Sequence, residues 1–199
     1  MGEFIMTTIY CVRHGQSEAN LAQIMQGSKI DTPLTKLGKQ QALAAKAKLA
    51  TVSFDAVYAS PLKRAVQTAK LISSATPTLD DRLVEFDYGT WDGQLLSDLY
   101  TQYPTYFDEH RNLLPNSWEV SGGPTYAQVT AKLESFLAEV TKKHPDQTLL
   151  VVSHGFTLKL LAALLLDIRN LQNLSEPANA SLTKLLVTPA TKTLVYYGK

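Results

Sequence analysis

The pattern of apolar and polar positions along the chain predicts short strands that are separated by helices. Apolar runs rich in β-branched residues at 7–12 and 148–153 are typical of buried strands. Shorter apolar runs at 54–59, 181–188 and 193–197 predict further strands. No internal repeat or low-complexity segment interrupts this order, so the pattern is typical of one folded unit.

Between the strands, apolar residues recur at helical spacing. Thr35 is a plausible N-cap for an alanine-rich helix that ends near Ala50. Ser60 and Pro61 predict an N-cap followed by proline at the first helical position of a second helix. Two further helices are predicted: a long one that opens at Pro124 and closes near His144, and an apolar one from about Thr157.

Alternating strands and helices predict an α/β fold with a largely parallel sheet that is covered on both faces. Residues 88–124 depart from this alternation, because they hold four of the glycines, three of the prolines and both tryptophans. We interpret this stretch as an excursion from the core of a single domain, residues 1–199, rather than as a second domain. Whether residues 1–5, which precede Met6, are native is left open.

Composition and charge exclude several classes of protein. The chain is 45% hydrophobic and 19% charged, and its net charge is +1, so no nucleic-acid partner is expected. The most apolar segment, 158–168, contains Lys159 and Asp167 and is too short to cross a membrane. No signal peptide is recognisable at the start of the sequence, and a cytoplasmic location is the expectation.

The single cysteine, Cys11, excludes an intramolecular disulfide and a cysteine-based zinc cluster. It lies within an apolar run, which favours a buried core residue over a reactive thiol. The four histidines show no close ligand spacing, so no metal site is expected either.

Two histidines follow predicted strands and precede a glycine, His14 after 7–12 and His154 after 148–153. Ligands of parallel sheets bind beyond the carboxyl ends of the strands, so both histidines are expected at the same edge. A histidine can act as a nucleophile when one ring nitrogen is held protonated and the other is free. Arg13, beside His14, offers a planar fork suited to phosphate oxygens. A loop histidine with a chance arginine neighbour is the alternative.

Two further motifs carry charge. Lys63 and Arg64 lie in the first turn of a predicted helix, where they oppose the helix dipole unless an anion binds nearby. Glu85 and Asp87 flank an aromatic residue, and a glutamate in a partly apolar setting can serve as a general acid. Taken singly, these residues also fit a surface arginine and a solvated loop carboxylate, and His154 fits a structural histidine.

Taken together and in this order, the motifs resemble the histidine phosphatase superfamily, in its phosphoglycerate-mutase-like branch. The resemblance covers most of the chain from Thr8 to about Leu166. The matching stretches are residues 12–17 with Asn20, 31–35 with Gly38, Gln41 and Ala42, 60–64 with Gln67, Thr68 and Ala69, 85–89 with Gly93, and 153–155.

The resemblance implies a three-layer α/β/α sandwich with a mostly parallel mixed sheet and a capping, lid-like insertion at about 88–124. It implies that His14 takes the phosphoryl group, that Glu85 is the acid, and that Arg13, Arg64 and His154 bind the phosphoryl oxygens. No metal or cofactor is implied. The residues implied to line the phosphate or substrate pocket are Ser17, Asn20, Gln26, Gly27, Tyr88 and Gly155.

The family contains phosphatases and mutases, and departures from the mutase pattern favour a phosphatase. Phe86 follows Glu85 where mutases usually have arginine, and Phe156 stands where they tend to have asparagine. No lysine occurs between Lys70 and Lys132, and Arg111 is the one arginine of 88–124. We therefore expect a metal-independent phosphomonoesterase that acts through a phosphohistidine on a small phosphorylated metabolite.

Three alternatives stay open: a cofactor-dependent phosphoglycerate mutase, a non-catalytic phospho-ligand binding protein, and a protein phosphatase. The substrate and the oligomeric state are not indicated by the sequence. The aromatic residues of 88–124 fit either an apolar substrate pocket or a small core of that segment, and the second interpretation is favoured. These residues are Trp91, Tyr103, Tyr106, Phe107 and Trp118.

Overall fold

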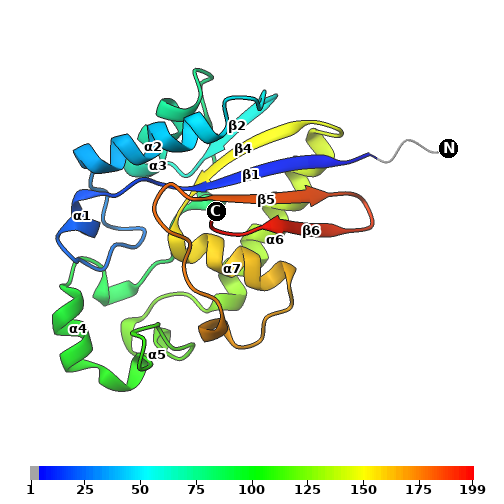
Figure 1. The fold of residues 1–199 in the computed structure, drawn as a ribbon. Coiled ribbons are helices and arrows are strands. Elements are labelled where there is room, and N and C mark those ends of the chain that lie inside the picture. The colour runs from blue at the N-terminus through cyan, green and yellow to red at the C-terminus, as the bar shows by residue number, and fades with distance from the viewer. Residues whose placement is uncertain (1–4) are drawn as a thin grey trace.

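A mixed β-sheet runs through the centre of the molecule (Figure 1). The computed structural model describes residues 5–199, in which six strands form one sheet of order β3-β2-β4-β1-β5-β6. The first four strands in this order are mutually parallel, whereas β5 pairs antiparallel with β1 and β6. The strands are β1 (Thr7–Arg13), β2 (Ala56–Ala59), β3 (Thr78–Leu79), β4 (Thr148–Ser153), β5 (Leu182–Val187) and β6 (Lys192–Tyr196).

Helices cover both faces of this sheet, as the alternation of its side chains requires. In β1, Ile9 and Cys11 face one core, whereas Val12 faces the other. The first core lies under α6 (Tyr126–Lys143) and α7 (Gly155–Leu165), and the second lies under α2 (Lys36–Lys48) and α3 (Lys63–Ile72). The predicted three-layer sandwich is thus confirmed. Cys11 is buried, and burial raises the pKa of its thiol to about 12.

The predicted helix boundaries hold where the capping signal is local. Thr35 caps α2, because its hydroxyl accepts a hydrogen bond from Gly38 N at 3.0 Å. Thr125 caps α6 in a capping box with Gln128. Helix α7 begins at Gly155, two residues earlier than predicted. No helix among residues 5–199 is long and apolar enough to span a membrane.

The start of α3 differs from the prediction. Ser60 is not its N-cap and Pro61 is not its first residue, because the helix begins at Lys63. Lys63 N donates instead to Asp31 Oδ1 at 2.7 Å, so a carboxylate from a distant loop supplies the cap and the anion that the dipole favours. The hydroxyl of Ser60 bonds the ring of His154 at 2.7 Å.

Residues 88–124 form short helices beyond the carboxyl ends of the strands (Figure 1). Trp91, 1% exposed, is the centre of a small aromatic core there. Its ring lies 4.9 Å from Tyr103 and 5.7 Å from Phe107 between centroids. Four of the five aromatics thus pack together, as the small-core interpretation predicts, but they join the core under α6 and α7. Phe107 also lines a cavity, and Trp118 packs against Tyr126 of α6. The helices of this segment are α4 (Leu96–Gln102), α5 (Trp118–Ser121), η2 (Gly89–Trp91) and η3 (Pro104–Tyr106).

The remaining elements are short. They are α1 (Glu18–Leu21), η1 (Asp81–Leu83) and η4 (Leu171–Asn173). Of residues 1–5, whose native origin the sequence leaves open, residues 1–4 lie outside the described residues.

Candidate active site

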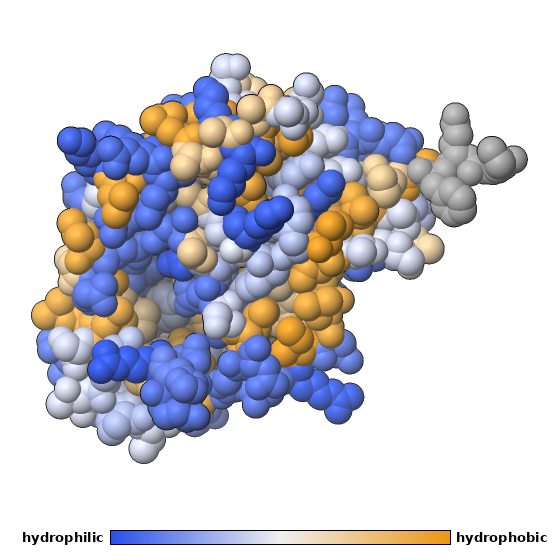
Figure 2. Space-filling view, viewed as in Figure 1, coloured by the Kyte–Doolittle hydropathy of each residue, from blue (hydrophilic) through white to orange (hydrophobic). Residues whose placement is uncertain are grey.

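His14 and His154 meet at the carboxyl ends of the neighbouring parallel strands β1 and β4. Their ring centroids are 5.1 Å apart, and His14 N donates to Ser153 O at 2.9 Å. The two histidines are therefore at one edge of the sheet, as expected from their positions after the strands. Figure 2 shows a hollow on this face of the molecule with a mostly hydrophilic rim.

Hydrogen bonds fix the tautomer of His14. Its Nδ1 lies 2.7 Å from Gly15 O, which can only accept, so Nδ1 carries the proton and Nε2 keeps its lone pair. The ring is 2% exposed. Burial, together with the charges of Arg64 and Arg13, lowers the pKa of His14 well below its ordinary value. The imidazole is consequently neutral, which is the form that a nucleophile requires.

Arg64 lies between the two histidines and is fully buried. Its Nε donates toward His14 Nε2 at 3.3 Å and His154 Nδ1 at 3.2 Å. Burial and the charge of Arg64 lower the pKa of His154 as well. The rest of the guanidinium holds the loop between α1 and α2, through Ile30 O at 2.8 Å and Gly27 O at 3.1 Å.

The carboxyl of Glu85 is bound at the amino end of α7. Its Oε1 accepts from Thr157 N at 3.0 Å and Thr157 Oγ1 at 2.9 Å, and its Oε2 accepts from Phe156 N at 3.3 Å. Burial and the neighbouring charge of Glu176 raise the pKa of Glu85, although backbone N–H donation and the arginines act in the opposite direction. The raised pKa makes Glu85 a more suitable proton donor than an ordinary glutamate.

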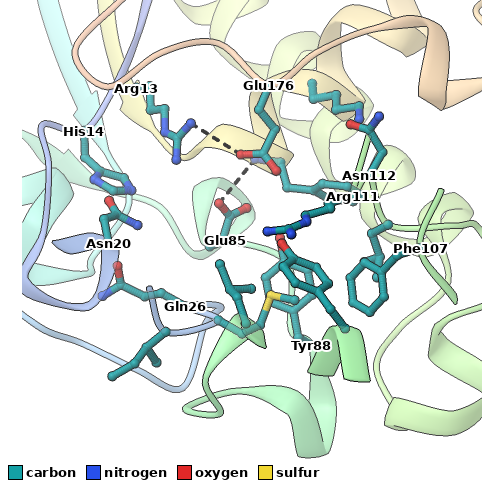
Figure 3. Close-up of a pocket in the computed structure, with 17 residues that line it drawn as sticks. Arg13, His14, Asn20, Gln26, Glu85, Tyr88, Phe107, Arg111, Asn112 and Glu176 are labelled. Carbon is teal, nitrogen blue, oxygen red and sulfur yellow. Dashed lines mark hydrogen bonds and ion pairs between the residues drawn. The ribbon is translucent and has the colours of Figure 1, made fainter. Parts of the chain in front are cut away.

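Arg13 is held in place by the segment that follows η4. Its Nη1 donates to Pro177 O at 2.7 Å and forms an ion pair with Glu176 Oε2 at 3.4 Å (Figure 3). A Cβ at Gly155 would lie 2.3 Å from Glu176 Oε2 and 2.7 Å from Arg13 Cζ, so a larger residue there would displace the ends of these two side chains. Glu176 belongs to none of the motifs and was missed by the sequence analysis.

The loop residues after His14 divide into two groups. Ser17 is fully buried, caps α1 through Asn20 N at 3.2 Å, and donates to Gln26 Oε1. Asn20 and Gln26 line the cavity next to His14. Gly27 lies behind them, with its N–H donated to Asp92 Oδ1 at 2.5 Å and its carbonyl bound by Arg64.

A cavity of about 200 Å³ extends from His14 to the segment 88–124 (Figure 3). His14, Arg13 and Glu85 line one end, whereas Phe107 and Arg111 line the other. The volume lies below the range of sites for drug-sized ligands, which begins at about 300 Å³, and so suits a small metabolite. The other lining residues are Asn20, Ile24, Met25, Gln26, Tyr88, Leu96, Tyr100, Asn112, Leu113, Phe156, Lys159 and Glu176.

The cavity contains a cation that the sequence analysis did not place there. Lys159 lies in α7 and lines the cavity although its residue is only 2% exposed. Lys159 lies outside the stretch between Lys70 and Lys132, in which the lack of lysine departs from the mutase pattern. A basic residue inside an otherwise apolar helix was the available signal.

Several residues of the matching motifs support the site from behind. Thr68 Oγ1 accepts from Gly15 N at 3.1 Å, and Gln67 Oε1 accepts from Leu34 N at 2.8 Å. The side chain of Gln16 turns toward Thr35, whose hydroxyl lies 2.9 Å from its Oε1. Within residues 5–199, no group of three histidine, cysteine or acidic side chains is arranged to hold a metal ion.

Comparisons with known proteins agree with this geometry. The family model of the histidine phosphatase superfamily (branch 1) matches residues 9–199. Phosphoserine phosphatase 1 of Hydrogenobacter thermophilus is 35% identical over 168 residues, which cover 82% of this chain and 78% of that protein. The adenosylcobalamin/alpha-ribazole phosphatase of Escherichia coli is 32% identical over 79% of this chain and 78% of its own length.

The solved structures include Bacillus stearothermophilus YhfR, with a TM-score of 0.88 and 28% identity over 97% of each chain. The predicted family and fold are thereby confirmed, and so is the prediction of a phosphatase.

Proposed function

Because the chain belongs to the histidine phosphatase superfamily (branch 1), we propose that it hydrolyses a small phosphomonoester without a metal, through a phosphohistidine at His14. The observation that carries this proposal is the state of His14. Its Nδ1 proton is donated to Gly15 O, and its Nε2, toward which Arg64 Nε donates at 3.3 Å, keeps the lone pair in a neutral ring that lines a cavity together with Glu85. A nucleophile and an acid with opposite pKa shifts are typical of acid–base catalysis at neutral pH.

In the first step His14 Nε2 attacks phosphorus and the bond to the ester oxygen breaks. The leaving oxygen takes the proton of Glu85, so that the alcohol departs neutral. In the second step water attacks the phosphohistidine and Glu85 accepts its proton. Inorganic phosphate leaves, and His14 and Glu85 return to their starting states.

The arginines and the neutral His154 around His14 stabilise the charge that spreads over the phosphoryl oxygens in the transition state. We assign this role to Arg13, Arg64 and His154. Arg13 lines the cavity directly, whereas Arg64 lies between the two histidines and donates toward both rings. Asn20, Gln26 and Tyr88 complete the wall, while Ser17, Gly27 and Gly155 shape it.

We assign the role of a lid to residues 88–124 within the single domain. Tyr88, Leu96, Phe107 and Arg111 of this segment form the wall opposite His14. Substrate choice then depends on these side chains, and the small cavity favours metabolites over phosphoproteins. A cytoplasmic location and the absence of a nucleic-acid partner remain predictions of the sequence.

The test is release of inorganic phosphate from p-nitrophenyl phosphate and from a panel of metabolite monoesters in excess EDTA. We expect release to persist in EDTA and to vanish in His14→Ala. His110→Ala is the matched control, because the side chain of His110 is 79% exposed, and it should keep its activity.

Loss of activity in EDTA would contradict the metal-free mechanism, and equal activity of His14→Ala would remove His14 from it. If no ester is hydrolysed, the phosphatase assignment falls. An assay of phosphoglycerate interconversion and measurement of phosphate-ester binding then separate a mutase from a binding protein.

A further inference from the structure

The wall of the cavity contains a buried lysine that has no ion-pair partner among the described residues. Lys159 is 2% exposed, and among residues 5–199 its amino group forms no ion pair. Its Nζ lies 5.7 Å from the centroid of the Phe156 ring. Burial of an unpaired cation costs folding free energy. The position of Lys159 at a cavity wall therefore points to an anionic partner that the chain itself does not supply.

The acidic groups nearest to Lys159 are already engaged. Glu176 and Asp108 act on it through space, and both oppose the lowering of its pKa by burial. Glu176, however, forms an ion pair with Arg13 at 3.4 Å. Asp108 accepts hydrogen bonds from Asn112 N at 2.7 Å and Asn112 Nδ2 at 2.9 Å. Neither carboxylate is therefore the missing partner.

A second cation lines the same cavity. Arg111 points into the cavity (Figure 3), and its Cζ lies 4.9 Å from the ring centroid of Tyr100, which also lines the wall. Like Lys159, Arg111 has no ion-pair partner in the part of the chain that the structure describes. One buried and one exposed cation thus line the cavity that His14 also lines, and Asp108, which acts on Lys159 through space, accepts a hydrogen bond from Arg111 N through its carbonyl at 2.9 Å.

We propose that Lys159 and Arg111 form a second anion subsite, which binds a carboxylate of the substrate while the phosphate lies at His14. The substrate is then a phosphorylated small carboxylic acid. A carboxylate carries one charge and fits an ammonium and a guanidinium. A second phosphoryl group would bring about two charges, and the cations that suit such a group gather at the other end of the cavity.

This inference rests on the proposed phosphatase function, and the test separates the two. The probes are 3-phosphoglycerate and glycerol 3-phosphate, which differ in a carboxylate against a hydroxymethyl group. For the unaltered protein we expect kcat/KM to favour 3-phosphoglycerate. The preference is the kcat/KM for 3-phosphoglycerate divided by that for glycerol 3-phosphate. Lys159→Met keeps the buried volume, and in this variant the ratio should fall by about 10-fold or more because the KM for 3-phosphoglycerate rises, as removal of a charged hydrogen-bond partner predicts.

Two further variants complete the design. Arg111→Gln should lower the same ratio, and Arg111 is exposed, so this substitution does not threaten the fold. Lys143→Met, at an exposed position at the end of α6, is the matched control and should leave the ratio unchanged. Calorimetry with inactive His14→Ala should show tighter binding of 3-phosphoglycerate than of glycerol 3-phosphate.

Equal turnover and equal binding of the two esters would overturn the carboxylate subsite and leave the phosphatase intact. The same follows if Lys159→Met and Arg111→Gln alter both esters alike. Preference for propane-1,3-diol bisphosphate over 3-phosphoglycerate would replace the carboxylate by a second phosphate and also overturn the proposal. Failure to hydrolyse any ester would instead overturn the proposed function, and the binding measurement would still decide the subsite.

Discussion

At the scale of single residues, the site depends on two groups whose pKa values move in opposite directions. Burial and two arginines keep His14 neutral, whereas burial and Glu176 favour the protonated form of Glu85. Each residue is thereby held in the form that the first chemical step needs. The ordinary pKa values, about 6.5 for histidine and about 4.3 for glutamate, would favour a protonated nucleophile and an ionised acid at mildly acidic pH.

Replacement of Glu85 by glutamine should slow poor leaving groups most, because they need the proton. We expect a loss of about 100-fold or more in kcat/KM for an alkyl phosphate and a much smaller loss for p-nitrophenyl phosphate. Glu134→Gln, at an exposed position of α6, is the control. Equal losses for the two esters would remove Glu85 from the role of acid.

The pH profile gives an independent check of the same residue. Because the pKa of Glu85 is raised, the activity on an alkyl ester should extend above the ordinary glutamate range and fall as pH rises through that raised pKa. Because the pKa of His14 is lowered, no acidic limb should occur near pH about 6.5. Glu85→Gln should lose the alkaline limb; a limb that persists in this variant belongs to another group.

At the scale of elements, the amino end of α7 connects the two halves of the site. His154 is the N-cap, and the next residues bring Phe156 N and Thr157 N to Glu85. Helix and acid are therefore positioned by the same backbone. The hydroxyl of Thr157 adds a second tie, because it lies 2.8 Å from Val84 O and 2.9 Å from Glu85 Oε1.

Thr157→Val keeps the shape of this side chain and removes its donor. Buried acceptors left without a partner cost about 1–3 kcal/mol, so the free energy of unfolding should fall by that amount. Loss of a donor to the carboxylate should also move the alkaline limb of activity to higher pH. Thr130→Val in α6, whose hydroxyl forms a solvent-exposed hydrogen bond to Ala127 O at 3.1 Å, is the matched control and should stay within about 0.5 kcal/mol. Denaturation measures the free energy of unfolding, and the pH profile of activity measures the alkaline limb. If neither changes, the hydroxyl of Thr157 does not position Glu85.

The elements also show where sequence patterns suffice. β1, β4 and the cap at Thr35 were predictable, because periodicity and capping depend on neighbouring residues. The start of α3 was not, because Asp31 caps it from another loop and Ser60 binds His154 instead. Such partners are set by the packed fold rather than by the local sequence.

The candidate site divides in the same way. Its residues with motif signals, such as His14 and Glu85, were identified from the sequence, and the structure brings them to one cavity. Lys159 and Glu176 were missed because their positions carry meaning only after α7 and the segment before β5 have folded against the sheet. The two-residue strand β3 lies below the length at which alternation is recognisable.

At the scale of the whole molecule, two buried neutral histidines couple stability to pH. Their folded-state pKa values are lowered, so His14 and His154 contribute stability above about pH 6.5 that is lost as pH falls. Urea denaturation of Glu85→Gln in phosphate-free buffer, which removes the opposing proton uptake of Glu85, should show the free energy of unfolding falling by up to about 2.7 kcal/mol per pH unit below that value. His14→Asn should roughly halve the slope. A flat dependence between about pH 7 and about pH 5 would contradict burial of neutral imidazoles.

The aromatic side chains around Trp91 pack together within residues 88–124 and extend the core that lies under α6 and α7. The residues that we assign to phosphate binding come from the strand ends and α3, whereas residues 88–124 contribute a large part of the remaining cavity wall. We therefore expect substitutions in residues 88–124 to change which phosphate ester is accepted while the residues that we assign to phosphate binding stay unchanged.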